Sequence, residues 1–213
     1  MTIRVLLADD HTLIREGLRA LLTSVPDISV IGEVHTGREA VSAVQQLDPD
    51  VVVMDLAMPD LNGIEAARLI HARHPAIRIV MLSMHSTAEH VYRALEAGAS
   101  GYLLKETAAD EVITAVRAVH AGRQYLCTAL AGSVGGSATF ARTPGPVDSL
   151  SPREQQVLQM VVEGKTSSEI AHILCLSPKS VETYRNRLMK KLGVENIPSL
   201  VKFALEHGLT PPK

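Results

Sequence analysis

Residues 51–60 read Val-Val-Val-Met-Asp-Leu-Ala-Met-Pro-Asp, and the apolar run at their start ends in the carboxylate of Asp55. Four consecutive apolar residues are typical of a strand that is buried on both faces, in the middle of a parallel sheet. Open α/β sheets bind their ligands at the carboxyl ends of the strands. Asp55 is therefore either the chemical centre of the protein or a capping residue of the turn that follows.

Strand-like and helix-like segments alternate on both sides of this run. Apolar runs predict strands at residues 3–8, 28–34, 51–55, 77–83 and 101–104. Helical spacing of apolar residues predicts helices at 11–24, 38–47, 88–97 and 108–121, and another that begins after Asn62. Five strand–helix units in alternation predict a doubly wound, five-stranded parallel sheet with helices on both faces.

The composition is that of a globular protein with an aliphatic core. Of the 213 residues 46% are hydrophobic and only 3% are aromatic. Cys127 and Cys175 form no metal-binding or disulfide pattern, which favours a reducing compartment, and Cys175 is expected to be a small buried side chain. Because we find neither a signal-peptide pattern nor a run long enough to span a bilayer, we expect a cytoplasmic protein without membrane contact.

A change of composition divides the chain in three. Residues 128–149 are rich in Gly, Pro, Ser, Thr and Ala, which predicts a flexible linker between a domain at 1–127 and another at 150–213. The net charge is −5 over residues 1–126 and +3 over residues 150–213. This asymmetry makes the second domain a candidate for an anionic partner.

From residue 150 the pattern is purely helical. Ser151 and Pro152 give a strong helix start, Ser177 and Pro178 repeat it, and further helices are expected at 167–174 and 199–207. The second and third of these four helices, with the short turn between them, form a helix-turn-helix candidate. Basic and short polar residues on the third helix suit DNA phosphates and base edges, although a solvated helix of a small bundle is the alternative.

Polar residues that could take part in a reaction or bind a ligand lie at the ends of four of the five predicted strands. They are Asp9 and Asp10, Asp55, Ser83 and Lys105. Each alone could be a cap or a surface residue, but parallel strands bring all of them to one edge of the sheet. Mg²⁺ suits such an acidic site because it binds few carboxylates and leaves positions for phosphate oxygens. A carboxylate beside the cation is a candidate phosphoryl acceptor.

These residues, together with the run from Asp55 to Gly63 and the pair Leu104-Lys105, resemble the receiver domain of bacterial two-component response regulators. The resemblance implies a flavodoxin-like fold with Mg²⁺ (or Mn²⁺) as cofactor. It implies Asp55 as the phosphorylation site and metal binding by Asp9, Asp10, Asp55 and the backbone carbonyl of Ala57. It also implies phosphoryl-contact and switch roles for Ser83, Tyr102 and Lys105.

The second domain resembles the LuxR-type DNA-binding domain. The motifs that carry this resemblance lie at residues 150–154, 163–166, 169–171 and 180–184. The residues that we expect to bind DNA are Lys165, Ser177, Lys179, Ser180, Glu182, Thr183, Tyr184, Arg185, Asn186, Arg187, Lys190 and Lys191.

Together the two domains resemble response regulators of the NarL/FixJ class. The resemblance implies a transcriptional regulator that takes its phosphoryl group from a sensor histidine kinase, forms a homodimer on activation and binds double-stranded promoter DNA. One alternative is an aspartyl-phosphate hydrolase, but Ala57 stands where that enzyme needs a second acid. The other is a constitutive DNA-binding protein whose receiver only mediates dimerisation.

Overall fold

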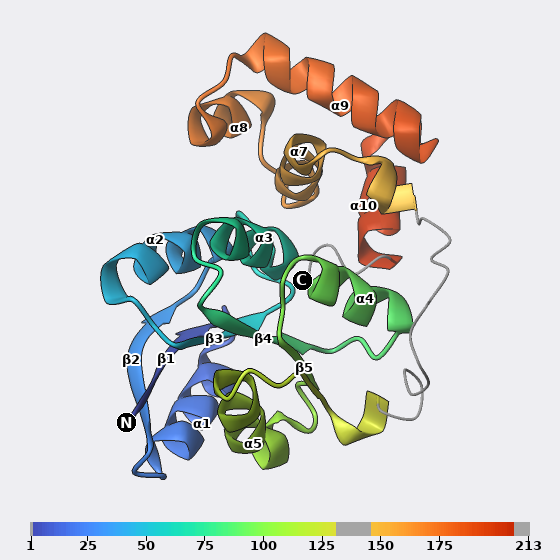
Figure 1. Cartoon of the computed structure of the whole chain (residues 1–213). Helices are drawn as coiled ribbons and strands as arrows, with labels where there is room; N and C mark the ends of the chain where they lie inside the picture. Colours follow the sequence, from blue (N-terminus) through green and yellow to red (C-terminus); the bar gives the residue numbers. More distant parts are fainter. Residues whose placement is uncertain (1, 131–145, 207–213) are drawn as a thin grey trace. The chain divides into compact units, whose positions relative to one another are not determined.

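The computed structural model describes residues 2–130 and 146–206, which form two compact units (Figure 1). The first unit comprises residues 1–138 and the second residues 139–213. Their boundary falls inside the predicted linker, and residues 131–145 of that linker lie outside the described residues. Within the described ranges, no helix is long and apolar enough to cross a membrane.

The first unit is built on a parallel sheet. Its strand order is β2-β1-β3-β4-β5-β6, and neighbouring strands are parallel throughout. The strands are β1 (Ile3–Ala8), β2 (Ile28–Val34), β3 (Val51–Asp55), β4 (Arg78–Ser83), β5 (Gly101–Leu104) and β6 (Tyr125–Leu126). The prediction of five strands missed β6, because two residues are too short to show any periodicity.

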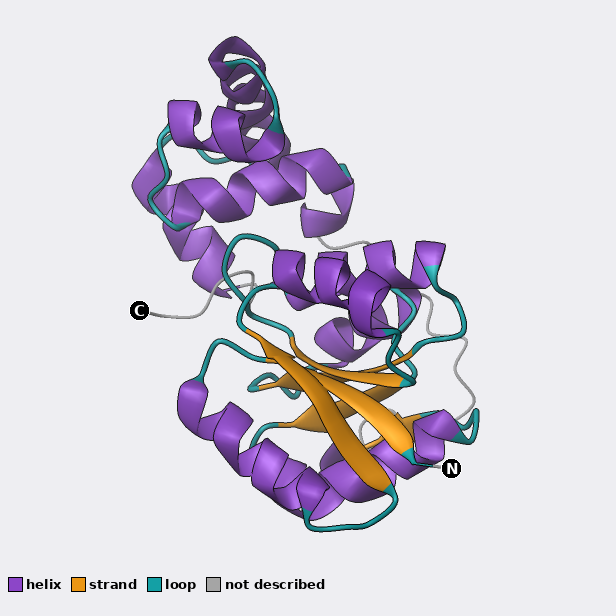
Figure 2. Cartoon of the chain, turned by 90° about the vertical axis from the view of Figure 1, so that its left-hand side faces the viewer, coloured by secondary structure: helices purple, strands orange, loops and turns teal. Residues whose placement is uncertain are grey.

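Among the described residues, five helices cover the two faces of this sheet (Figures 1 and 2). Helices α1 (Thr12–Thr23) and α5 (Ala108–His120) lie on one face. Helices α2 (Gly37–Leu47), α3 (Gly63–Arg73) and α4 (Ala88–Glu96) lie on the other. The expected two-sided cover is therefore confirmed.

Strand β3 runs through the centre of the core. Its residues Val51 to Met54 are at most 1% exposed, since β1 and β4 flank the strand and helices cover both faces. Asp55, the last residue of β3, is 2% exposed. Because β1 is the neighbour of β3, the residues that follow β1 reach the same edge as Asp55.

The loop after β3 folds back closely on the end of that strand. The backbone amide of Gly63 donates to the carbonyl of Leu56 at 2.8 Å, and Asn62 caps α3 by accepting from the amide of Glu65 at 2.9 Å. A Cβ atom at Gly63 would lie 2.1 Å from the carbonyl oxygen of Asp55. Only glycine therefore fits between the start of α3 and the end of β3.

The second unit is a small helical domain with its own core. It contains a short 3-10 helix, η1 (Pro146–Ser149), and the helices α7 (Pro152–Val162), α8 (Ser167–Leu174), α9 (Pro178–Leu192) and α10 (Ile197–Glu206). Capping boxes open α7 and α8, as the Ser and Thr side chains accept from the backbone three residues later. The predicted fourth helix begins two residues earlier than expected, and its predicted end at His207 lies outside the described residues.

Two local expectations need correction. Leu130 packs into the core of the first unit and Val147 into the core of the second, so the ends of the segment predicted as a flexible linker are packed. Cys175 is exposed, and the prediction that it is buried was wrong. The residue ends α8 in the left-handed region, with a φ of 52°, and this turn directs its side chain out of the core.

We expect Gly63→Ala to lower the free energy of unfolding of the first unit by about 3 kcal/mol, because the new methyl group would collide with backbone. Gly17→Ala is the matched control. Gly17 lies inside α1, and a Cβ atom added there would meet no other atom within 4 Å, so alanine should stabilise by roughly 0.5–1 kcal/mol. Urea denaturation measures both changes, and equal effects of the two substitutions would contradict the close approach at Gly63.

Candidate functional site

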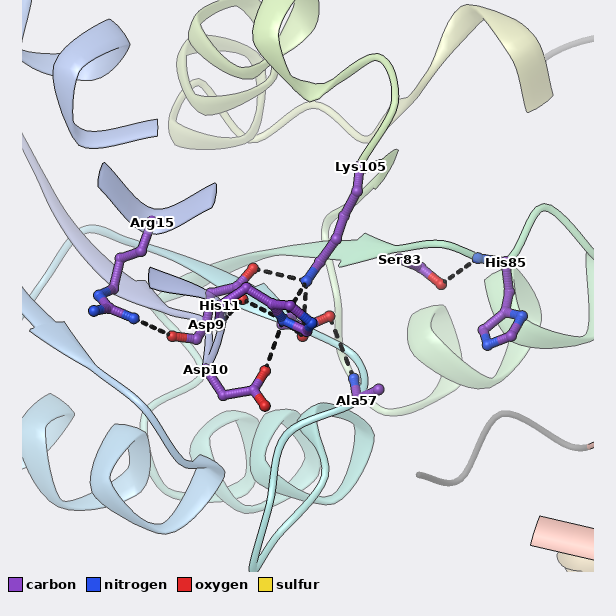
Figure 3. Close-up of polar contacts among 9 residues, drawn as sticks. Asp9, Asp10, His11, Arg15, Ala57, Ser83, His85 and Lys105 are labelled. Carbon is purple, nitrogen blue, oxygen red and sulfur yellow. Dashed lines mark hydrogen bonds and ion pairs between the residues drawn. The ribbon is translucent and has the colours of Figure 1, made fainter. Parts of the chain in front are cut away.

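An acidic cluster occupies the carboxyl edge of the sheet (Figure 3). Asp9 and Asp10 follow β1 directly, and Asp55 ends β3. Asp9 and Asp55 are buried, whereas Asp10 is partly exposed. One ligand atom from each of the three acids, together with one from His11, lies within 4.8 Å of all the others. The convergence that parallel strands predict for the acids is thus present.

Lys105 joins two of these acids. Its Nζ lies 2.9 Å from Asp9 Oδ2 and 2.9 Å from Asp55 Oδ2, and its side chain is only 4% exposed. The backbone of Lys105 is fixed as well, because its amide donates to the carbonyl of Ser83 at 2.8 Å. Burial opposes the charged form, but the carboxylates of Asp55 and Asp9 raise the pKa of Lys105 above its ordinary value. The lysine is therefore a permanent cation in the cluster.

Asp55 is the acid whose ionisation the surroundings oppose most. The pKa of Asp55 is raised to about 6, mainly by burial; Lys105 opposes this rise, and the charge of Asp9 contributes to it. The second oxygen of the carboxylate, Oδ1, accepts weakly from the amide of Ala57 at 3.3 Å. At neutral pH the carboxylate of Asp55 is consequently ionised, but its surroundings stabilise the charge poorly.

His11 lies at the mouth of the cluster, and the sequence reasoning missed it. Its Nδ1 is 2.9 Å from Asp10 Oδ1, 3.1 Å from Asp9 Oδ1 and 3.4 Å from Lys105 Nζ. The histidine is the N-cap residue of α1 and follows the two acids directly. That position was the available signal, because a residue between a strand-end acid and a helix start must lie near the acid.

Arg15 supports the cluster from behind. Its Nη1 donates to the carbonyl oxygen of Asp9 at 2.8 Å, and its Nε lies 3.2 Å from the carboxylate of Glu33. The side chain is 8% exposed although it carries a charge. A buried arginine that binds both the backbone of Asp9 and a neighbouring strand fixes where β1 ends.

Ser83 and Tyr102 meet at the loop that follows β4. The Ser83 hydroxyl oxygen accepts from the amide of His85 at 2.9 Å, and the Tyr102 hydroxyl donates to the carbonyl of His85 at 2.9 Å. Tyr102 is completely buried, and burial raises the pKa of its phenol, so the hydroxyl remains a donor. The two predicted switch residues therefore both form hydrogen bonds with the backbone of His85.

Six of the α9 residues predicted to bind DNA form an exposed strip. Val181 and Leu188 are buried in the core of the second unit, and Tyr184 packs partly against it. The helix exposes, at spacings of three and four residues, Lys179, Glu182, Thr183, Asn186, Arg187 and Lys190. We call these six residues the α9 strip. Ser177 caps the helix by accepting from the amide of Ser180 at 3.1 Å.

Three predicted DNA-binding cations have partners inside the domain. Lys165 Nζ lies 2.8 Å from Glu163, and Arg185 donates to the Ser167 hydroxyl at 2.7 Å. Lys191 Nζ lies 2.7 Å from the carboxylate of Glu154. Burial acts to raise the pKa of Glu154, but Lys191 and the backbone of Ser151 bring it below its ordinary value. Arg185 and Lys191 join α9 to α8 and α7, so the positive charge that α9 offers to a ligand comes mainly from Lys179, Arg187 and Lys190 of its exposed face.

We expect Asp55→Asn to raise the free energy of unfolding at pH 8 in the absence of divalent cations, by about 1–3 kcal/mol. The raised pKa means that protonated Asp55 stabilises the fold below about pH 4, and that this contribution is lost as the pH rises through about 6. The advantage of the variant should therefore grow between these values. Urea denaturation at several pH values measures this advantage. A difference in unfolding free energy that does not change with pH would contradict the raised pKa of Asp55.

The chain matches two family models in succession. Residues 5–117 match the response regulator receiver domain, and residues 148–204 match the bacterial regulatory proteins of the luxR family. The response regulator UvrY of Escherichia coli (strain K12) is 38% identical over 208 residues, which cover 97% of this chain and 95% of UvrY. The response regulator GacA of Pseudomonas protegens is 36% identical, and the match covers 97% of each chain.

Solved structures agree with this assignment. A LuxR family response regulator from Aurantimonas sp. SI85-9A1 superimposes with a TM-score of 0.61 at 38% identity, over 63% of this chain and 96% of that one. The response regulator RcsB in a complex with DNA gives a TM-score of 0.60 at 27% identity, over 96% of this chain and 98% of RcsB. The chain therefore belongs to the two-component response regulators that join a receiver domain to a LuxR-type helix-turn-helix domain, a family of regulators and not of enzymes.

Proposed function

We propose that this response regulator accepts a phosphoryl group on Asp55 and that phosphorylation controls the binding of its C-terminal domain to promoter DNA. The observation that carries the proposal is the position of Lys105, whose ammonium lies 2.9 Å from the carboxylates of both Asp9 and Asp55. A cation held between a reactive carboxylate and a second acid is well placed to neutralise an incoming phosphoryl oxygen.

The acidic cluster fits a hard divalent cation. Asp9, Asp10 and Asp55 offer carboxylate oxygens, and Lys105 is the one positive side chain buried among them in the described chain. Oxygen donors with excess negative charge suit Mg²⁺ or Mn²⁺. We assign Asp9 and Asp10 as the principal ligands, with Asp55 and the Ala57 carbonyl completing the set. When bound, the cation would neutralise charge on the phosphoryl oxygens.

The chain's own residues then perform the transfer. A carboxylate oxygen of Asp55 attacks the phosphorus atom of the donor, a phosphohistidine of the sensor kinase, and the phosphorus–nitrogen bond breaks as the acyl phosphate forms. The histidine nitrogen leaves with the electron pair of that bond. Lys105 holds one phosphoryl oxygen, and the Ser83 hydroxyl turns to donate to another.

The loop after β4 is the proposed route of the signal. When Ser83 turns to the phosphoryl group, the amide of His85 loses its acceptor, while the bond from Tyr102 to the His85 carbonyl remains. This change would bias a surface formed by α4, β5 and α5 between two arrangements. We assign homodimerisation to the phosphorylated arrangement.

The α9 strip is the proposed reader of DNA. Lys179, Arg187 and Lys190 supply positive charge for phosphates, and Thr183 and Asn186 are short enough to reach base edges in the major groove. The relative RcsB, whose dimers were solved on DNA, supports this assignment. A homodimer would read two half-sites about one helical turn apart. A protein that binds promoter DNA would act in the cytoplasm.

We expect Asp55→Asn to abolish phosphorylation by acetyl phosphate and Mg²⁺, because the amide cannot form an acyl phosphate. Intact-protein mass spectrometry measures the added phosphoryl group. Asp60→Asn is the matched control, since it removes a carboxylate from the same loop and should leave labelling intact. Labelling of Asp55→Asn at the level of the unsubstituted protein would refute the assignment.

We expect Arg187→Ala to weaken DNA binding roughly tenfold and to reduce the slope of log affinity against log salt by about one, as loss of a phosphate contact does. Lys202→Ala, which removes an exposed cation from α10, should change neither quantity appreciably. Titration at several salt concentrations, with and without phosphodonor, measures both. An affinity that no phosphodonor alters would favour the constitutive alternative, in which the receiver only dimerises.

A further inference from the structure

We propose that His11 is a nitrogen ligand of the metal site and gives that site a preference for first-row transition cations such as Co²⁺, Zn²⁺ or Fe²⁺ over Mg²⁺. The inference rests on the proposed function, because it extends the metal site assigned there. It concerns a residue that the acids alone do not require, since three carboxylates and a carbonyl already satisfy a hard cation.

The spacing of the donor atoms carries the proposal. His11 Nδ1 lies 2.9 Å from Asp10 Oδ1 and 3.1 Å from Asp9 Oδ1 (Figure 3). Adjacent ligands of an octahedral cation with bonds of about 2.1 Å lie about 3 Å apart. Each oxygen is in hydrogen-bond or ion-pair contact with the imidazole nitrogen, at a distance that a shared cation would also impose. Asp55 Oδ2, at 3.8 Å from Nδ1, needs only a small further shift.

The backbone holds the imidazole in this position. The His11 amide donates to Asp9 Oδ1 at 2.8 Å, so the root of the side chain is tied to the same oxygen that the ring contacts. The ring makes no capping hydrogen bond to α1, although the residue is the N-cap. With 49% of the side chain exposed, the ring can turn aside to admit a cation and then return.

The chemistry of the donors predicts selectivity. Carboxylates alone suit Mg²⁺, whereas an imidazole nitrogen adds affinity for the later first-row cations. The charges also agree, because a divalent cation together with Lys105 would balance the three carboxylates of Asp9, Asp10 and Asp55. The opposite view is that the ring itself serves as a counter-cation and competes with every metal ion. The two views predict opposite effects of removing the ring.

Competition titrations of Co²⁺ and Mg²⁺ on the full chain test the proposal. We expect His11→Ala and His11→Asn to lower the ratio of Co²⁺ to Mg²⁺ affinity at least about tenfold. The visible absorption of bound Co²⁺ should also shift as a nitrogen ligand is lost, which a merely structural role would not cause. His120→Ala, which removes an exposed histidine at the end of α5, is the matched control and should change neither.

The outcomes separate this inference from the proposed function. An unchanged ratio and an unchanged Co²⁺ spectrum in His11→Ala would overturn the role of His11, as would tighter binding of both cations. If Mg²⁺ binding is lost in Asp10→Asn at the same time, the proposed metal site still stands. Failure of the unsubstituted chain to bind either cation would overturn both.

Discussion

The burial of like charges at one edge of a parallel sheet is the constraint on which the receiver unit depends. The order of the strands brings Asp9 and Asp55 together, and the core around β1 and β3 keeps water away from them. Lys105 is the group that makes this tolerable, because one ammonium contacts both carboxylates. Burial still raises the pKa of Asp55 to about 6, so further positive charge beside the cluster would stabilise the ionised carboxylate. Arg15, which binds the Asp9 carbonyl, and the close turn at Gly63 hold the ends of β1 and β3 in place against the repulsion between the carboxylates.

The sequence predicted the elements of this unit that have a periodic pattern. It also predicted which residues meet at the carboxyl ends of the parallel strands. Apolar runs showed the five longer strands, and the edge they share placed the three acids with Lys105. His11 was missed because its contact with the acids depends on the direction of one side chain at a helix start, and periodicity does not predict that direction. Strand β6 escaped because two residues, Tyr125 and Leu126, carry no alternation of their own. Cys175 was misjudged because a small residue in a tight turn between two helices was expected to be buried, whereas it is the exposed left-handed cap of α8.

In the second unit, periodicity identified the exposed face of α9 but not the partners of its charges. Spacing along one helix tells which side chains face outward, and the α9 strip agrees with it. Whether a basic side chain already contacts an acidic one depends on residues elsewhere in the domain. Glu154 lies 37 positions before Lys191 and on another helix, so only the folded structure shows their contact. A list of basic residues on a recognition helix therefore overstates the charge that is available to a ligand.

The contact between Lys191 and Glu154 has a mechanical consequence. Glu154 also accepts from the amide of Ser151 at 2.7 Å, and Lys191 donates to the carbonyl of Ser149 at 2.9 Å. The last turn of α9 is thereby held to residues 149–154, where the helical core of the second unit begins. A displacement of these residues would be passed directly to the C-terminal end of α9.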